Sequence, residues 1–154
     1  MSELYLNSNL ISSIDVFKEV NFPNLKILNL SCNKIVSIDS LAKITCLKLE
    51  EINLRMNMII NVEPLSKANL VFLKELHLDN NNISDVSCFS KTNLKFLQRL
   101  YLNNNFISNI QNFKNNPFPR LDTLTLEGNK INNNDENNKK IIEDLEKKKI
   151  YTGF

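Results

Sequence analysis

The chain has 154 residues, about the length of one domain, and 42% of them are hydrophobic, which is enough to bury a core. Its 19 basic and 17 acidic residues give a formal net charge of +2, so charge alone makes no case for nucleic acid or membrane binding. Glycine occurs only twice, which argues against glycine-rich phosphate-binding loops. No segment approaches the roughly 20 consecutive apolar residues of a membrane span.

The N-terminus and the cysteines bear on the cellular compartment. Residues 1–7 contain no basic region followed by an apolar run, so they do not resemble a secretory signal. The three cysteines, Cys32, Cys46 and Cys88, are odd in number and widely spaced, which argues against a disulfide framework. We therefore expect a reducing compartment, cytoplasmic or nuclear, without secretion, and we interpret Cys46 and Cys88 as packing or incidental residues.

A nine-residue segment recurs along the chain at a constant step. The segment LKILNLSCN begins at Leu25 and recurs from residues 49, 73, 97 and 121, and residues 1–9 are the same unit, so the step is 24. With each start counted as position 0, apolar residues are expected at positions 0, 3, 5, 10, 13, 16 and 21. They fill 40 of these 42 places, the exceptions being Asn134 and Asn137, whereas random placement at 42% would fill about 18. Position 8 is asparagine in every unit: Asn9, Asn33, Asn57, Asn81, Asn105 and Asn129.

This pattern resembles the leucine-rich-repeat family over residues 1 to about 131. Within the family it is most similar to the short intracellular type, as in the leucine-rich regulatory subunit of protein phosphatase 1. The resemblance implies an α/β fold, a right-handed solenoid with a curved parallel β-sheet on the concave face and short helices or 3₁₀ turns on the convex face. We divide the chain into six repeats over residues 1–131 and a polar loop with a C-terminal capping helix over residues 132–154.

Each unit is expected to begin with a strand and then turn away from the sheet. Alternation predicts that Leu28 and Leu30 point inward while Ile27, Asn29 and Ser31 point outward, and neighbouring strands stack in parallel about 4.8 Å apart. The asparagine at position 8 lies where the chain leaves the sheet. Its amide can bond backbone groups of its own turn and of the adjacent turn, so the six asparagines are expected to form a ladder.

The return path of each unit is expected to hold a short helix or 3₁₀ turn. Positions 10 and 13 fill the space behind the sheet, and positions 16 and 21 anchor the return. Asp15, Asp39 and Ser87 are predicted N-cap residues, and Pro64 fits a first helical position.

The two ends of the repeat array are expected to differ. Residues 132–138 look like a polar loop, and apolar residues three and four apart in 139–149 (Ile141, Ile142 and Leu145) predict an amphipathic helix. We interpret it as a cap over the last repeat, with Ile150, Tyr151 and Phe154 packing nearby; the alternative is a solvated tail that docks on a partner. At the other end the strand around residues 3–6 would be an exposed edge, which invites pairing with another chain.

The outward positions 2, 4 and 6 of the strands form the expected binding surface, since their chemistry varies from unit to unit while the core positions hardly vary. They carry five acidic and two basic residues, a net charge of −3, which favours a partner with a basic patch. The plainer alternative is a solvated sheet on which Glu75 pairs with Arg99 and Arg55 with Asp79. The candidate partner-binding residues are Tyr5, Ile27, Glu51, Arg55, Glu75, His77, Asp79, Arg99, Tyr101 and Asn103.

Glu75, His77 and Asp79 are spaced so that all three face the same side of a strand, where they could in principle bind a metal or support acid–base chemistry. An open, wet sheet offers no pocket to exclude water or shift a pKa. We therefore expect no catalytic residues, no metal and no cofactor.

The sequence thus predicts a non-catalytic protein-interaction module or scaffold that binds a protein on its concave face, without naming the partner. One alternative is a structural segment of a longer array that self-associates through the N-terminal edge strand. Another is RNA binding, which the net acidic concave positions disfavour. The resemblance also raises phosphatase regulation.

Overall fold

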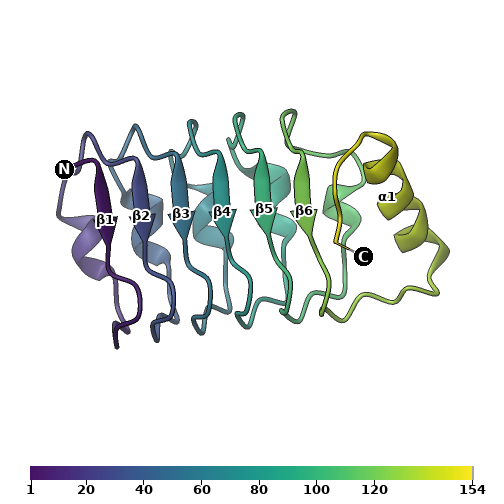
Figure 1. Cartoon of the computed structure of the whole chain (residues 1–154), viewed down its shortest axis with the longest axis horizontal. Helices are drawn as coiled ribbons and strands as arrows, with labels where there is room; N and C mark the ends of the chain where they lie inside the picture. Colours follow the sequence, from purple (N-terminus) through teal and green to yellow (C-terminus); the bar gives the residue numbers. More distant parts are fainter. Residues whose placement is uncertain (154) are drawn as a thin grey trace.

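The computed structural model describes residues 1–153 as a single row of parallel strands in chain order. Each strand pairs with the next so that equivalent positions of successive repeats lie side by side, as Leu28 does beside Ile52 and Ile52 beside Leu76. Figure 1 shows the strands side by side, with the helical turns on the opposite side of the solenoid. The predicted fold class is confirmed. The strands are β1 (Glu3–Tyr5), β2 (Ile27–Asn29), β3 (Glu51–Asn53), β4 (Glu75–His77), β5 (Arg99–Tyr101) and β6 (Thr123–Thr125).

Short 3₁₀ helices line the convex side, as expected. They are η1 (Asp15–Lys18), η2 (Asp39–Lys43), η3 (Glu63–Ser66), η4 (Ser87–Lys91) and η5 (Gln111–Phe113). The predicted N-caps are wrong: Asp15, Asp39 and Ser87 are first helical residues, and Pro64 is the second residue of η3.

The capping side chain instead comes from position 12, two residues before each turn. Its oxygen accepts a hydrogen bond from the first N–H of the helix at 2.8–3.2 Å in all five units. A 3₁₀ turn is entered through such a short-range side-chain-to-backbone bond because Ser, Asn and Asp readily form it in non-helical backbone. The residues at this position are Ser13, Ser37, Asn61, Asp85 and Asn109.

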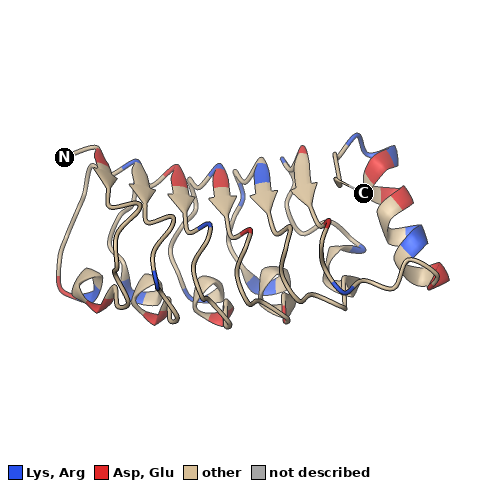
Figure 2. Ribbon diagram, turned by 60° about the horizontal axis from the view of Figure 1, so that its bottom comes forward, with Lys and Arg blue, Asp and Glu red and all other residues tan. Residues whose placement is uncertain are grey.

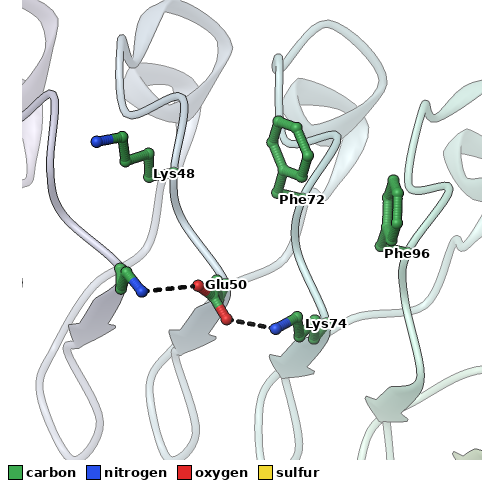
Figure 3. Close-up of a pocket in the computed structure, with 6 residues that line it drawn as sticks. Lys48, Glu50, Phe72, Lys74 and Phe96 are labelled. Carbon is green, nitrogen blue, oxygen red and sulfur yellow. Dashed lines mark hydrogen bonds and ion pairs between the residues drawn. The ribbon is translucent and has the colours of Figure 1, made fainter.

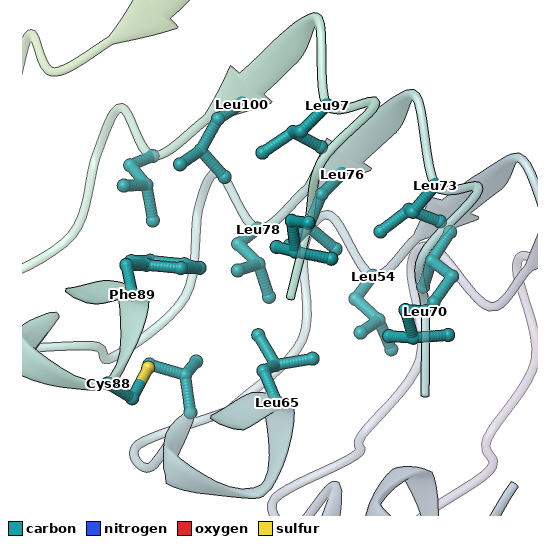
Figure 4. Close-up of a cluster of buried hydrophobic side chains, with 14 of the residues drawn as sticks. Leu54, Leu65, Leu70, Leu73, Leu76, Leu78, Cys88, Phe89, Leu97 and Leu100 are labelled. Atoms are coloured by element: carbon teal, nitrogen blue, oxygen red, sulfur yellow. The ribbon is translucent and has the colours of Figure 1, made fainter. Parts of the chain in front are cut away.

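The core runs as one continuous column between the sheet and the 3₁₀ turns. Figure 4 shows its central part, in which leucines from successive strands pack against Leu65, Cys88 and Phe89 of the return path. Both Cys46 and Cys88 are buried in it. Because each repeat buries its apolar residues mainly against its neighbours, stability depends on stacking rather than on any single unit.

The asparagine ladder forms, with one exception at its start. Asn81 accepts a hydrogen bond from the backbone N–H of Ile59 at 3.0 Å and donates to the carbonyl oxygens of Leu54 and Leu78, both at 3.0 Å. Asn33, Asn57, Asn105 and Asn129 repeat this arrangement. Asn9, in the first repeat, donates only to carbonyl oxygens of its own turn.

The turn just before each ladder asparagine requires a left-handed backbone. Position 7 has φ between 53° and 57° in the first five repeats and φ 68° at Gly128 in the sixth. Side-chain-bearing residues adopt this conformation at a cost, which glycine escapes and asparagine reduces. The residues are Ser8, Cys32, Met56, Asn80, Asn104 and Gly128.

The C-terminal segment covers the last repeat. Helix α1 (Glu136–Lys147) begins three residues before the predicted range, because the Asp135 side chain accepts the N–H groups of Asn137 and Asn138. Ile141 and Leu145 face the core. After the helix, residues 150–152 run beside β6 and exchange backbone hydrogen bonds with it, which closes that edge. Phe154 lies outside the described residues.

The N-terminal edge lacks an equivalent cover within the described residues. The side of β1 that faces away from β2 carries no strand, and the core-position residues Leu4, Leu6, Ile11 and Phe22 are only partly buried. No helix within residues 1–153 is long and apolar enough to cross a membrane.

Candidate functional site

The predicted binding residues lie on one face of the sheet, because positions 2 and 4 flank a buried apolar residue at position 3 in each strand. From β2 to β6 the strands show the same burial pattern, with a buried centre and two half-buried neighbours. Figure 2 shows acidic residues on β1, β3 and β4 and a basic residue on β5. The concave face therefore presents charge of both signs rather than one uniform field.

Four of these residues form what we call the central cluster: Glu75, His77, Arg99 and Tyr101 on β4 and β5. The strand register places Glu75 beside Arg99 and His77 beside Tyr101. The guanidinium of Arg99 forms an ion pair with Glu75, whose other oxygen lies 3.6 Å from Nε2 of His77. The His77 and Tyr101 rings stack with centroids 4.5 Å apart and planes 16° apart. All four side chains are thus linked to one another.

A second ion pair lies beside the central cluster. Nε of Arg55 is 3.1 Å from Oδ2 of Asp79, and the amide of Asn80 donates to the same oxygen at 2.8 Å. Asp79 itself is buried, so the member of this ion pair that a partner can contact is chiefly Arg55, whose side chain is 54% exposed. Both predicted cross-strand ion pairs therefore form. Asn103 accepts a hydrogen bond from the Thr125 hydroxyl at 2.8 Å.

The environment of the central cluster fixes its charge state. The hydrogen bond from Arg99 holds the pKa of the Glu75 carboxyl below its usual value. Burial lowers the pKa of His77 in spite of the acidic groups of Glu51, Glu75 and Asp79 nearby. At neutral pH the cluster therefore contains a carboxylate, a guanidinium and an uncharged imidazole.

The remaining predicted residues are not part of this cluster. Tyr5 lies on β1, three strands from β4, and its hydroxyl donates to Glu3 at 3.0 Å. Ile27 and Glu51 lie side by side on β2 and β3, and Glu51 is next to Glu75 in register. The structure thus separates a linked centre from a looser N-terminal half.

The possible acid–base or metal triplet of Glu75, His77 and Asp79 is engaged elsewhere. Glu75 pairs with Arg99, and Asp79 is buried against Arg55. In the described part of the chain no group of three or more His, Cys, Asp and Glu is placed to hold a metal ion. Both carboxylates are therefore held by arginines rather than arranged around a common ligand.

Sequence reasoning missed a second surface, at the edge of the sheet where the strands begin. Lys26, Glu50 and Lys74 occupy position 1 of successive repeats, and Phe72 and Phe96 occupy position 23. Together with Lys48 they line one hollow, shown in Figure 3. The available signal was a phenylalanine outside the core positions that recurs one repeat later.

Two family models match the chain. One, described as Leucine Rich repeats (2 copies), matches residues 1–43, and another, described as Leucine rich repeat, matches residues 23–83 and 72–131. No curated protein sequence matches. The predicted resemblance therefore rests on matches that cover most of the chain.

Similar solved structures also support the leucine-rich-repeat fold. The chain is similar to the internalin inlF from Listeria monocytogenes, with 28% identity and a TM-score of 0.69 over 87% of this chain and 37% of that one. It is similar to the plant peptide hormone receptor RGFR1 in complex with RGF2, with 26% identity and a TM-score of 0.55 over 70% of this chain and 17% of that one. Internalin C2 from Listeria monocytogenes shares the fold at 24% identity and a TM-score of 0.60, over 86% of this chain and 64% of that one.

The chain thus spans between about a third and two thirds of the internalins that it matches. Its repeats, its parallel sheet and its 3₁₀ turns agree with the family models and with these neighbours. Proteins of this fold are in general non-enzymatic and bind proteins. The chain belongs to the leucine-rich-repeat family.

Proposed function

We propose that the concave face binds a protein partner through the central cluster of Glu75, His77, Arg99 and Tyr101. The observation that carries this proposal is the linkage of the four side chains across β4 and β5 on an open face. Tyrosine and arginine are the residue types that most often dominate binding energy at protein interfaces. Here both stand on the same face of β5, beside their partners on β4.

Preorganisation supports this choice of residues. The ion pair and the ring stack already restrain Arg99 and Tyr101, so less side-chain freedom is lost when a partner binds. The Arg99 side chain is still 39% exposed, which leaves part of its guanidinium available to a partner. Tyr5 is exposed and has only the hydrogen bond to Glu3, without a ring stack or an ion pair beside it.

The charge of the concave positions favours a partner with a basic patch. Positions 2, 4 and 6 carry a net charge of −3 over the six repeats, with acidic groups at Glu3, Glu51 and Glu127 outside the paired centre. Complementary charge accelerates association and selects among partners more than it adds affinity. The same charge opposes a polyanion, which makes RNA a poor occupant of this face.

Non-enzymatic function and a reducing compartment complete the proposal. The carboxylates of the central region are engaged by arginines, and the face is open to water, so nothing there activates a nucleophile. Cys32, Cys46 and Cys88 are all free thiols, which suits a reducing compartment. Within that compartment the chain acts as an interaction module or scaffold.

The test is a comparison of partner capture by two variants. The double variant Arg99→Ala, Tyr101→Ala removes half of the central cluster, whereas Tyr5→Ala removes the same residue type at the same repeat position on β1. Circular dichroism first confirms that both variants fold. Each protein that the original chain captures is then purified. Its affinities for the original chain and for the two variants are measured directly by calorimetry.

We expect the double variant to weaken binding at least tenfold, or by about 1.4 kcal/mol or more, and Tyr5→Ala to change it less than threefold. Equal affinity of the double variant and the original chain would reject the central cluster as the binding site. A larger effect of Tyr5→Ala would move the site to the N-terminal half of the face.

Self-association is a second candidate, favoured by the side of β1 on which no strand lies within residues 1–153. Strand edges with free N–H and C=O groups pair readily with another chain, and the partly exposed Leu4 and Leu6 lie beside that edge. Analytical ultracentrifugation over a wide concentration range tests it. A mass that rises with concentration and falls back after Leu4→Lys supports pairing at β1, and a constant monomer mass excludes it.

A further inference from the structure

The edge where the strands begin carries a column of stacked side chains at position 23. The rings of Phe72 and Phe96 stack with centroids 5.6 Å apart, and Cζ of Arg120 lies 4.3 Å from the centroid of Phe96. Lys48 continues the column on the other side, with Nζ 2.7 Å from the side-chain oxygen of Asn24. Phe72 is 52% exposed, so the column presents apolar surface to solvent.

A row of ion pairs runs parallel to this column at position 1. Nζ of Lys26 is 3.3 Å and Nζ of Lys74 is 2.5 Å from the carboxylate of Glu50. The hydrogen bond from Lys74 lowers the pKa of Glu50, which keeps the carboxylate charged. Figure 3 shows Lys48, Phe72 and Phe96 on one side of the hollow and this row on the other. We call the hollow, of about 310 Å³, the edge groove.

The charges around the edge groove do not balance. Three lysines and one carboxylate, that of Glu50, line the groove, which gives it a local net charge of +2. In residues 1–153 neither Lys48 nor Arg120 forms an ion pair, since Lys48 bonds a neutral amide and Arg120 lies over a ring. The groove therefore combines uncompensated positive charge with an exposed aromatic wall, opposite in sign to the neighbouring concave face.

We propose that the edge groove docks an acidic peptide segment of a partner that carries one large apolar side chain. The apolar side chain packs against the rings of Phe72 and Phe96, and the flanking carboxylates pair with Lys48 and with the lysines of the position 1 row. The groove volume is at the lower end of the roughly 300–1,000 Å³ that binding pockets offer, which suits one side chain and its backbone. This surface is separate from the central cluster, so it does not depend on the proposed function.

A nucleic acid fits this surface less well, although cations and aromatic rings also bind single strands. Bases stack on open ring faces. Phe96 lies between Phe72 and Arg120, so the outer face of Phe72 is the one ring face of this pair that a base could use. The net acidic concave positions next to the groove also repel a phosphate backbone that continues beyond it.

The test uses a fluorescein-labelled decapeptide of aspartate and glutamate residues around one central phenylalanine, followed by fluorescence anisotropy. Two matched peptides replace the phenylalanine by alanine or all the acidic residues by their amides. The protein variants are Lys48→Glu and Phe72→Ala. Lys67→Glu, an equal charge reversal at an exposed position on the convex side, is the matched control, and Lys48→Gln replaces Lys48→Glu if that variant fails to fold.

We expect Lys48→Glu and Phe72→Ala each to weaken binding of the acidic peptide at least fivefold, and Lys67→Glu to change it less than twofold. Both matched peptides should bind at least fivefold more weakly than the parent. Equal binding by Lys48→Glu and the original chain, or by the amide peptide and the parent, overturns the proposal.

Two further outcomes identify a different occupant. Tighter binding of labelled single-stranded RNA than of the acidic peptide, lost in Lys48→Glu, overturns the proposal in favour of a nucleic acid. A concentration-dependent mass that Phe72→Ala abolishes overturns it in favour of a second copy of the chain. Neither result bears on the central cluster, because Arg99→Ala, Tyr101→Ala is assayed separately.

Discussion

The imidazole of His77 lies flat against the ring of Tyr101 on the neighbouring strand, with the centroids 4.5 Å apart. The parallel register alone brings the two rings together, since they occupy the same position of successive repeats. Burial lowers the pKa of this imidazole, although Glu51, Glu75 and Asp79 lie close enough to favour its protonation. The stacked ring of Tyr101 covers one face of the imidazole and so contributes to the burial of the chain's single histidine.

This relationship predicts the titration of His77. Its pKa should lie below the usual value of about 6.5, and Tyr101→Ala should raise it by exposing the ring to water. Because the folded pKa is depressed, the histidine's contribution to stability is complete above pH 6.5 and is lost as the pH falls below it. NMR titration of the histidine Cε1 proton checks the prediction. Tyr5→Ala serves as the control and should leave the pKa unchanged; a value above 6.5 in the original chain contradicts the argument.

The asparagine ladder predicts very different costs for two chemically identical substitutions. Asn81→Ala leaves the buried Ile59 N–H without its partner. It also removes one of the two asparagine hydrogen bonds that each of the carbonyl oxygens of Leu54 and Leu78 accepts. We expect it to lower the free energy of unfolding by about 3 kcal/mol, since an unpaired buried group costs about 1–3 kcal/mol and each lost hydrogen bond about 1 kcal/mol. Asn9→Ala affects only exposed bonds within its own turn and should cost about 0.5 kcal/mol. Urea unfolding of both variants measures the difference, and equal losses would show that the ladder does not stabilise the stack.

Backbone strain at position 7 predicts a stabilising substitution. Met56 has φ 53°, a left-handed conformation that asparagine tolerates better than methionine and already occupies in two other repeats. Met56→Asn should therefore raise the free energy of unfolding by up to about 1 kcal/mol. Met58→Asn is the matched control, because Met58 has nearly the same exposure without a positive φ. Thermal unfolding distinguishes them, and an equal change in both variants would assign the effect to the removed methionine surface instead.

The fold could be predicted from the sequence because the apolar residues that recur every 24 positions are those that become buried. The asparagine ladder could also be predicted, since an asparagine side chain can accept from one donor and donate to two acceptors in one turn. The left-handed backbone at position 7 could not be predicted because the six residues there, from Ser8 to Gly128, share no side-chain chemistry. What they share is a backbone angle, which a single sequence does not display.

The position 12 caps were visible in the sequence but were assigned two residues too late. Asp15 and Asp39 looked like caps because acidic residues favour helix starts, yet the bond that matters comes from Ser13 and Ser37. The edge groove was missed for a different reason. Phe72 and Phe96 meet only because residues one repeat apart are neighbours in space, and the predicted binding surface took its variable positions from within the strands, which leaves out position 23.

The burial of Cys88 predicts its reactivity and a pH dependence. Burial, with the charges of Glu63 and Asp85, raises the pKa of the Cys88 thiol to about 12, so the thiolate is scarce at pH 8. Iodoacetamide should therefore label the partly exposed Cys32 in the native protein well before the buried Cys46 and Cys88, as peptide mass spectrometry would show. In denaturant all three should react at similar rates. If native Cys88 is alkylated as fast as Cys32, its repeat opens readily and the thiol is not held in the core.

The same shift couples Cys88 to stability in alkaline solution. An unfolded thiol ionises near pH 9, whereas the folded one resists ionisation up to about pH 12. The free energy of unfolding should be unaffected by this group below pH 9 and should fall as the pH rises from 9 toward 12, because only the unfolded state releases the proton. Cys88→Ala lowers stability at every pH by leaving a small cavity, but it should flatten the alkaline slope. Unfolding in urea at pH 8, 9 and 10 separates the two effects, and an unchanged slope in the variant would assign the alkaline loss to other groups.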